Sequence, residues 1–294
     1  MSTSRRLRTV AVAAGLAAAA ATGTASAEST TAEPVYVAMG DSYAAGVGIA
    51  PVTTVNGVVG LCSQSTVNYP KLVAKALHAK VFRDVSCGGA TSADLAGTQP
   101  DLTGPAAPQY DALTPDTTLV TIGMGGNDIG LVQLGVSCIN PLPEPYGQSC
   151  AAANTAGGRD LVGEHIDAFA PTYGTIIEQI RQRSPLARIV LVGYPQGIRE
   201  NGCPGVQPAW PADATYLQAK IDQLNAVMAA QAAAHDATFV SLTASTRGHD
   251  ACAAPGQSWM VGAVPTSPDA VVPLHPNAAS HANTARQVLA ALDR

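Results

Sequence analysis

The sequence lacks several features that would place it in familiar classes of protein. Beyond residue 30, Gly, Pro or charged residues interrupt every apolar run before it reaches the about 20 residues of a membrane-spanning helix. Basic residues are fewer than acidic ones, 16 against 21, so no broad positive field attracts nucleic acid or anionic lipid. There is also no internal repeat. We therefore expect no membrane span and no nucleic-acid partner.

Two chemical signatures are also missing. No Cys-x-x-Cys pair is present, which argues against a zinc site. No Gly-x-Ser-x-Gly elbow is present, which argues against a catalytic serine of the α/β-hydrolase type.

The N-terminus predicts an export signal. Arg5, Arg6 and Arg8 precede an apolar run, and Ala25-Ser26-Ala27 offers a small-residue cleavage site. We favour general secretion over twin-arginine export, because no strongly apolar pattern follows the arginine pair. Residues 1–27 are thus predicted to be a signal peptide, and residues 28–294 a single, secreted, extracellular domain, which we expect to be a monomer.

The cysteines are the main indication of the redox compartment in which the protein folds. An exported chain with six of them is expected to form three disulfides. Six cysteines permit about 15 connectivities, and pairing in sequence order closes the shortest loops. The expected pairs are Cys62–Cys87, Cys138–Cys150 and Cys203–Cys252.

Apolar runs rich in branched residues alternate with stretches of helical periodicity, which predicts a mainly parallel sheet with helices on both faces. The predicted strands are 35–39, 81–85, 119–123, 189–192 and 238–242. The predicted helices are 69–78, 166–183, 215–234 and 277–292. Three long segments rich in Gly, Pro and Ala (49–67, 130–164 and 244–274) are expected to be ordered surface loops that shape a pocket.

The first predicted strand ends in Gly40-Asp41-Ser42. Gly40 and Gly46 allow a tight turn that exposes the hydroxyl and N–H of Ser42 at the carboxyl end of the strand, where ligands of parallel sheets bind. Taken alone, a serine after a Gly-Asp turn is usually structural. Ser42 becomes a candidate nucleophile only together with other residues.

Two more strand ends carry Gly-rich polar turns, Cys87-Gly88-Gly89-Ala90-Thr91 and Gly123-Met124-Gly125-Gly126-Asn127-Asp128. The N–H groups of Ser42 and Gly89 and the side-chain amide of Asn127 are candidate donors to a developing oxyanion. Either turn alone would be read as a tight loop. Asp41 and Asp128 are expected to brace their turns through main-chain hydrogen bonds.

A general base is available in Pro273-Leu274-His275-Pro276, just before the last predicted helix. A loop can aim His275 at Ser42, whereas His281 falls inside the helix and is expected to be a surface or packing residue. The remaining histidines are expected to be ordinary surface residues: His78, His165, His235 and His249.

Taken in order, four blocks resemble the SGNH, or GDSL, hydrolases, and in particular secreted lipases and esterases of actinobacteria. They are Gly40-Asp41-Ser42, Gly89-Ala90-Thr91, Gly125-Gly126-Asn127-Asp128 and His275-Pro276-Asn277. The resemblance implies a three-layer α/β/α fold of the flavodoxin-like kind. The resemblance assigns the four residues that give the SGNH family its name to Ser42, Gly89, Asn127 and His275. Pairing of the cysteines in sequence order is similar to the disulfide pattern of the streptomycete members.

One departure from the family pattern concerns the group that orients His275. The position three residues before it, usually an acid, is Val272. The backbone carbonyl of Val272 or Pro273 is the favoured acceptor for Nδ1, and Asp269 is the alternative. Either acceptor keeps Nδ1 protonated and Nε2 free to act as a base.

The predicted reaction is hydrolysis of carboxylic esters through an acyl-enzyme on Ser42, with no metal or organic cofactor. The sequence has only two tryptophans, so it offers few aromatic side chains on which a sugar ring could stack. This favours small-molecule or lipid acyl esters as substrates. Carbohydrate acetyl esters are the first alternative. Trp259 is expected either in a pocket wall or in the core. A non-catalytic secreted binding protein that retains the fold is the alternative from another class.

Overall fold

The computed structural model describes residues 33–266 and 272–293. The predicted signal peptide and Asp269 lie outside these residues. Five strands form one all-parallel sheet in the order β2-β1-β3-β4-β5. The strands are β1 (Val35–Gly40), β2 (Val81–Asp84), β3 (Leu119–Gly123), β4 (Arg188–Val192) and β5 (Thr238–Val240).

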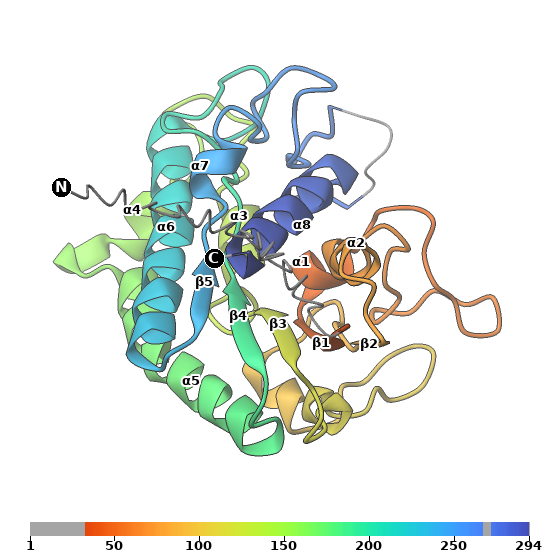
Figure 1. Cartoon of the computed structure of the whole chain (residues 1–294). Helices are drawn as coiled ribbons and strands as arrows, with labels where there is room; N and C mark the ends of the chain where they lie inside the picture. Colours follow the sequence, from red (N-terminus) through yellow and green to blue (C-terminus); the bar gives the residue numbers. More distant parts are fainter. Residues whose placement is uncertain (1–32, 267–271, 294) are drawn as a thin grey trace, which may run out of the picture. The chain divides into compact units, whose positions relative to one another are not determined.

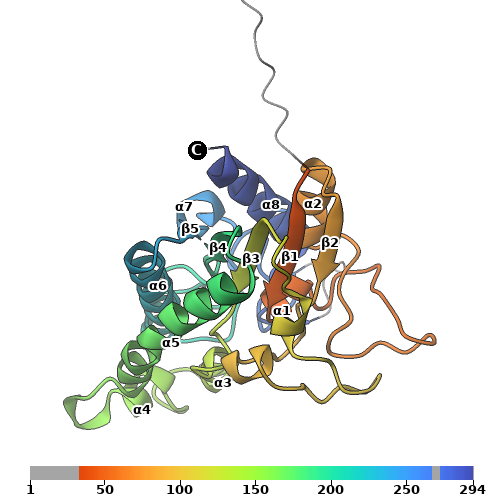
Figure 2. The same cartoon turned by 60° about the horizontal axis from the view of Figure 1, so that its bottom comes forward.

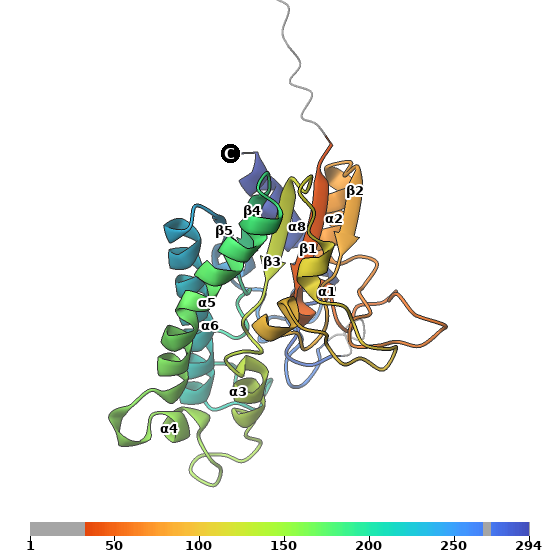
Figure 3. The same cartoon turned by 90° about the horizontal axis from the view of Figure 1, so that it is seen from below.

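Two pairs of long helices cover the sheet. On one face α5 (Leu161–Arg183) packs beside α6 (Pro211–Ala234), and on the other α2 (Tyr69–Ala76) packs beside α8 (Ala278–Leu292) (Figures 1 and 3). The three layers confirm the predicted fold class. The shorter helices are α1 (Ser42–Ala45), α3 (Leu131–Ser137), α4 (Cys150–Asn154) and α7 (Thr243–Thr246), with 3-10 turns η1 (Ser92–Leu95), η2 (Gln109–Ala112) and η3 (Ala156–Gly158).

The core follows from the two-residue period of the strands. In β1, Val37 and Met39 pack toward α5 and α6, while Tyr36 and Ala38 pack toward α2 and α8. Both sets are fully buried. A strand buried on both faces therefore reads as a continuous apolar run, which is the pattern that the sequence shows.

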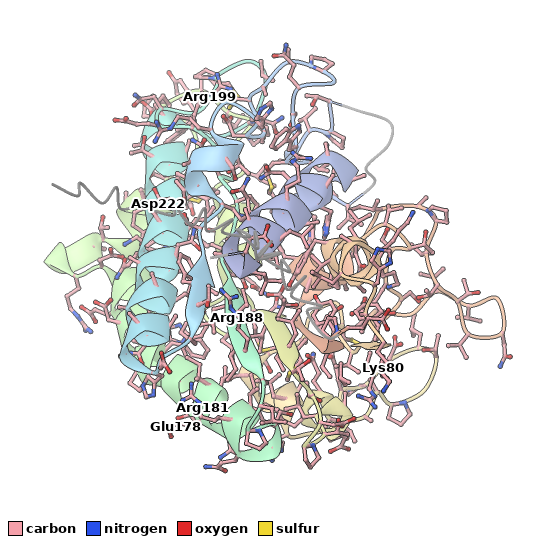
Figure 4. The ribbon with its side chains drawn as sticks, in the orientation of Figure 1. Lys80, Glu178, Arg181, Arg188, Arg199 and Asp222 are labelled. Atoms are coloured by element: carbon pink, nitrogen blue, oxygen red, sulfur yellow. A yellow bond between two sulfur atoms is a disulfide. The ribbon has the colours of Figure 1, made fainter. Side chains whose placement is uncertain are left out.

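Polar contacts fix the last helix against the sheet. Arg188, at the start of β4 and labelled in Figure 4, donates hydrogen bonds to the carbonyl oxygens of Leu292 (2.7 Å) and Ala291 (2.6 Å). These carbonyls belong to the last turn of α8 and have no partner within the helix, and a cation is favoured at that end. The helix that follows His275 is therefore anchored at its far end.

The predicted loop 130–164 is only partly a loop. It contains α3, α4 and the first turn of α5, which are too short or too rich in Gly and Ala to give a clear helical period. Because the strands are parallel, their carboxyl ends meet at one edge, from which α1 and the turns after β2 and β3 emerge (Figure 2). The candidate site is built there.

Candidate active site

The turn after β1 presents Ser42 as the first residue of α1. Asp41 caps this helix by accepting a hydrogen bond of 2.9 Å from the N–H of Tyr43. A Cβ atom at Gly40, which has φ of 140°, would overlap the carbonyl oxygen of Gly123. Glycine is required there because β1 and β3 approach so closely.

Gly40 is also clamped by a side chain. Its N–H donates to Gln109 Oε1 (2.8 Å), and its carbonyl oxygen accepts from Gln109 Nε2 (3.0 Å) and from the N–H of Cys87 (3.1 Å). The turn that carries Ser42 is therefore fixed by three hydrogen bonds just before it. A fixed backbone is what a nucleophile needs to keep its orientation.

His275 lies in the loop before α8 and meets Ser42. Its Nε2 is 2.9 Å from Ser42 Oγ, and its Nδ1 is 2.9 Å from the carbonyl oxygen of Pro273. A carbonyl oxygen only accepts, so Nδ1 carries the proton and Nε2 is free to accept the serine proton. Of the candidate orienting groups, the structure therefore brings the Pro273 carbonyl to the ring.

Both partners are shielded from water, with Ser42 6% and His275 8% exposed. Burial lowers the pKa of His275 below its ordinary value of 6.5, and the hydrogen bond to Pro273 opposes that shift. The imidazole is consequently neutral at pH 7, which is the form that can act as a base.

The candidate oxyanion donors lie on the turns that follow β1, β2 and β3. Within the described part of the chain, the N–H groups of Ser42 and Gly89 have no acceptor. Asn127 Nδ2 donates 2.9 Å to the carbonyl oxygen of Ala90, which ties the β3 turn to the β2 turn. An amide nitrogen has two hydrogens, so one remains for another acceptor.

Asp128 braces the same two turns. Its carboxylate accepts hydrogen bonds from the N–H (2.9 Å) and the hydroxyl (2.6 Å) of Ser92. Burial raises the pKa of Asp128, and the bonds from Ser92 oppose the shift. It has a structural partner and no contact with Ser42.

Tyr194 joins the nucleophile turn to the Asn127 turn and was missed from the sequence. Its hydroxyl donates to Asp41 Oδ2 (2.6 Å) and accepts from the N–H of Gly126 (2.7 Å). Burial raises the pKa of Asp41 to about 7, and the Tyr194 hydrogen bond acts in the opposite direction. A signal was available, because Tyr194 follows β4 as the other site residues follow β1, β2 and β3.

Tyr43 is the second missed residue. Its hydroxyl donates 2.6 Å to the carbonyl oxygen of Leu274, and its ring lies 5.3 Å from the ring of His275. Leu274 has φ of 62°, a region that residues other than glycine adopt at a cost. Tyr43 therefore helps to hold the turn that aims His275.

A deep apolar pocket adjoins the site. It has an empty volume of about 660 Å³, including the part open to solvent, and its lining includes Tyr43 and Leu274, the chain neighbours of Ser42 and His275. Buried walls come from Ile221 and Met260, and half-exposed Pro208, Ala209 and Ala263 lie toward the surface. An apolar chain attached to a group at Ser42 can extend into this space.

The other histidines and Trp259 stand apart from this site. His281 is buried, its Nδ1 accepts from the N–H of Tyr69 (3.0 Å), and burial lowers its pKa to about 3, so it is a packing residue. Trp259 is half-buried and stacks on His249 at 3.6 Å instead of lining the deep pocket. His78 and His165 are exposed, and His235 pairs with Glu178 at 3.3 Å.

Three disulfides fix the loops around the site. They join Cys62 to Cys87, Cys138 to Cys150, and Cys203 to Cys252, so each cysteine is bonded to its neighbour in sequence order. The first ends directly before Gly88-Gly89. The other two hold the loops around the deep pocket.

Comparison with known proteins assigns the chain to a family. The model of the GDSL-like lipase/acylhydrolase family matches residues 38–282, from β1 to the first turns of α8. The chain belongs to this family. It is thus a carboxylic ester hydrolase, as the four sequence blocks predict.

Relatives of this GDSL-like hydrolase come from Streptomyces. It is 36% identical over 258 residues to lipase 2 of Streptomyces coelicolor, covering 83% of this chain and 80% of that protein. It is 34% identical over 280 residues to an esterase of Streptomyces scabiei, covering 84% and 81%.

Solved structures have the same fold. Phospholipase A1 from Streptomyces albidoflavus aligns with a TM-score of 0.70 at 26% identity, over 89% of this chain and 99% of that one. An extracellular lipase from Streptomyces rimosus aligns with a TM-score of 0.68 at 28% identity, over 88% and 97%.

Proposed function

We propose that this GDSL-like hydrolase is a secreted enzyme that cleaves carboxylic esters of apolar acyl chains through an acyl-enzyme on Ser42. The observation that carries the proposal is the hydrogen bond of 2.9 Å between Ser42 Oγ and His275 Nε2. It joins a hydroxyl and a neutral imidazole, which is the arrangement that activates a serine nucleophile.

The reaction follows from this contact. His275 Nε2 takes the proton of Ser42 as Oγ attacks the ester carbonyl carbon, and it then gives that proton to the departing alcohol. A water molecule next loses a proton to His275 and attacks the acyl carbon. The proton returns to Ser42 Oγ as the carboxylic acid leaves.

Three donors are proposed to hold the tetrahedral oxyanion: the N–H of Ser42, the N–H of Gly89 and the second hydrogen of Asn127 Nδ2. The two free N–H groups and the fixed Asn127 amide support this assignment. Removal of one such donor usually slows acyl transfer by about 10²–10³.

The Pro273 carbonyl is proposed to do the orienting work of a triad carboxylate. It holds Nδ1 protonated at 2.9 Å, and so selects the tautomer in which Nε2 is the base. It carries no full charge, so it stabilises the imidazolium less than a carboxylate does. The resulting machinery is a Ser42–His275 dyad with a backbone orienting group.

The deep pocket supports apolar acyl chains as substrates. Each buried CH₂ group contributes about 0.8 kcal/mol to binding, so a chain that extends past Tyr43 and Leu274 is favoured over an acetyl group, which leaves the pocket unfilled. The similarity to a phospholipase A1 and to lipases agrees with lipid esters. The acetyl group of a carbohydrate ester is too short to extend into the deep pocket.

Secretion and a monomeric state complete the proposal. Three disulfides suit an oxidising extracellular compartment, and one similar structure is an extracellular lipase. Among the described residues no helix is long and apolar enough to cross a bilayer. Residues 1–27 would act as the signal peptide.

The test is hydrolysis of p-nitrophenyl esters from acetate to palmitate by the purified protein. We expect kcat/KM to rise with chain length beyond acetate, and Ser42→Ala to lose at least about 10³-fold. The matched control is Ser137→Ala, which makes the same change at an exposed serine of α3 and should keep full activity. Acetate as the best substrate would contradict the acyl-chain assignment.

A further inference from the structure

A group of apolar side chains is held out toward solvent near the deep pocket. Ile139, Leu142, Val206 and Val264, here called the apolar rim, are 40%, 52%, 46% and 48% exposed. They come from three segments that are far apart in sequence: the connection after α3, the connection before α6 and the loop before α8. Large contiguous apolar surface on a folded protein usually marks a binding face.

Hydrogen bonds tie the three segments to one another. The N–H of Asn140 donates to Pro208 O (2.6 Å), and Trp210 Nε1 donates to Leu142 O (2.7 Å). Gln207 exchanges two hydrogen bonds with the backbone of Val264, at 2.9 and 3.0 Å. The segments after β4 and before α8 accordingly run together in Figure 1.

Two disulfides fix the same segments. Cys138–Cys150 begins directly before Ile139, and Cys203–Cys252 lies three residues before Val206. The disulfides and the hydrogen bonds restrain the backbone of the segments that carry the rim, so the exposed apolar side chains stand on a fixed frame.

The apolar rim is continuous with the deep pocket. Leu142, Val206 and Val264 line a shallow hollow with an empty volume of about 940 Å³, including open solvent. Gln207, Pro208 and Ala209 line both the hollow and the deep pocket, and Ile139 lines the deep pocket. The rim thus borders the same pocket that Tyr43 and Leu274 line.

The charge of this surface indicates the kind of partner. Segments 136–146, 204–210 and 258–266 contain a single charged residue, Glu144, and no Lys or Arg. An anionic surface would gain nothing from such a face, because there is no cation to attract it. A neutral or zwitterionic apolar phase fits it.

We propose that the apolar rim is the face by which this enzyme docks on the surface of a neutral or zwitterionic lipid aggregate, with an acyl chain passing from the lipid into the deep pocket. The inference rests on the proposed function, which supplies the identity of the substrate. It adds which surface of the enzyme binds the lipid, and that the lipid is bound as an aggregate.

A second exposed apolar group is the main competitor. Val55, Val58, Val59, Leu61 and Leu102 lie on the loops near Cys62 and are 47–84% exposed. The hollow between these loops, lined by Thr53, Asp101 and Pro105 among others, shares no residue with the deep pocket. The rim is favoured because its hollow shares three lining residues with the deep pocket, whereas the competing hollow shares none.

Docking is tested by co-sedimentation with phosphatidylcholine vesicles, using Ser42→Ala protein so that no lipid is consumed. Adding Leu142→Asp and Val264→Asp should lower vesicle partitioning at least about tenfold, because two charges must leave water. The matched control is Leu186→Asp, which changes a leucine that is 67% exposed in the connection from α5 to β4, at the opposite edge of the sheet. It should bind as the parent does, and 0.5 M salt or added phosphatidylglycerol should change binding less than about twofold.

The outcomes are separable. In active enzyme the rim substitutions should keep kcat/KM on monomeric p-nitrophenyl butyrate and lower turnover of vesicle lipid. Circular dichroism checks that the variant is folded, and the milder Val206→Ser replaces it if it is not. The proposal is overturned if rim variants partition like the parent, or if Val58→Asp with Val59→Asp abolishes binding instead.

Self-association is a further overturning outcome. If ultracentrifugation shows a dimer that the rim substitutions dissociate, while vesicle binding is unchanged, the face is an interface between copies. Absence of any ester hydrolysis would refute the proposed function but not the docking, because the vesicle measurement uses inactive protein.

Discussion

The hydroxyl group of Tyr43 donates a hydrogen bond of 2.6 Å to the carbonyl oxygen of Leu274. The residue directly after the serine thereby holds the residue directly before the histidine. The two partners are separated by 231 positions in the chain, so this bond joins the first turn of the fold to the last loop. The two segments that carry Ser42 and His275 are thus hydrogen-bonded to each other directly beside the catalytic pair.

Tyr43→Phe should lower kcat on a soluble ester about tenfold with little change in KM, because phenylalanine keeps the ring that lines the deep pocket and loses only the hydroxyl bond that holds the turn before His275. The matched control is Tyr36→Phe. The Tyr36 hydroxyl also makes one buried bond, 2.7 Å to Thr121, but it lies within the sheet. The control should lose stability and keep kcat, whereas equal kcat losses in both variants would contradict a positioning role.

Asp269→Asn should leave kcat within about threefold of the parent, because the Nδ1 proton of His275 is already accepted by Pro273. The measurement is steady-state hydrolysis of p-nitrophenyl butyrate. A thousandfold loss would instead establish Asp269 as the third member of a triad.

The pH dependence of kcat/KM should show a one-proton acid limb with its midpoint below 6.5. Burial lowers the pKa of His275, so the neutral base persists below that pH and activity disappears only as the pH falls through the lowered pKa. Asp41, with a pKa of about 7, is the competing titration. Asp41→Asn should therefore retain the limb. A midpoint near 7 that vanishes in this variant would assign it to Asp41.

Gly135→Val should shorten the preferred acyl chain. Gly135 lines the deep pocket, and a Cβ atom there would lie 3.0 Å from Leu274 Cδ1. The added isopropyl group occupies the space of about three methylene groups, so kcat/KM on long-chain esters should fall at least about tenfold relative to acetate. The ratio of palmitate to acetate rates measures the effect, and an unchanged ratio would place the chain elsewhere.

Much of the fold was predictable because strands buried on both faces carry an unbroken apolar signal. The strand 119–123 is observed with the predicted bounds, whereas α5 begins five residues and α6 four residues earlier than predicted. Their first turns lack a clear apolar period, for example Pro211-Ala-Asp-Ala. At the start of α5 the N–H of Gly163 donates a capping hydrogen bond to Asp160 Oδ1, a local contact that periodicity does not detect.

Less of the site was predictable. Glycine-rich turns after strands indicate where backbone N–H groups are exposed, so Ser42, Gly89 and Asn127 could be proposed together. Tyr194 and Tyr43 act through bonds to residues that are distant in the chain, and nothing in the sequence near them gives their partners. The deep pocket likewise depends on how several segments that are distant in the chain pack together.

The most direct test of the central claim is labelling with a fluorophosphonate, followed by mass spectrometry of the digested protein. We expect one adduct per molecule, on the peptide that contains Ser42, absent in Ser42→Ala and formed at least about 10³-fold more slowly in His275→Ala. An adduct on another residue, or full ester hydrolysis by Ser42→Ala, would contradict it.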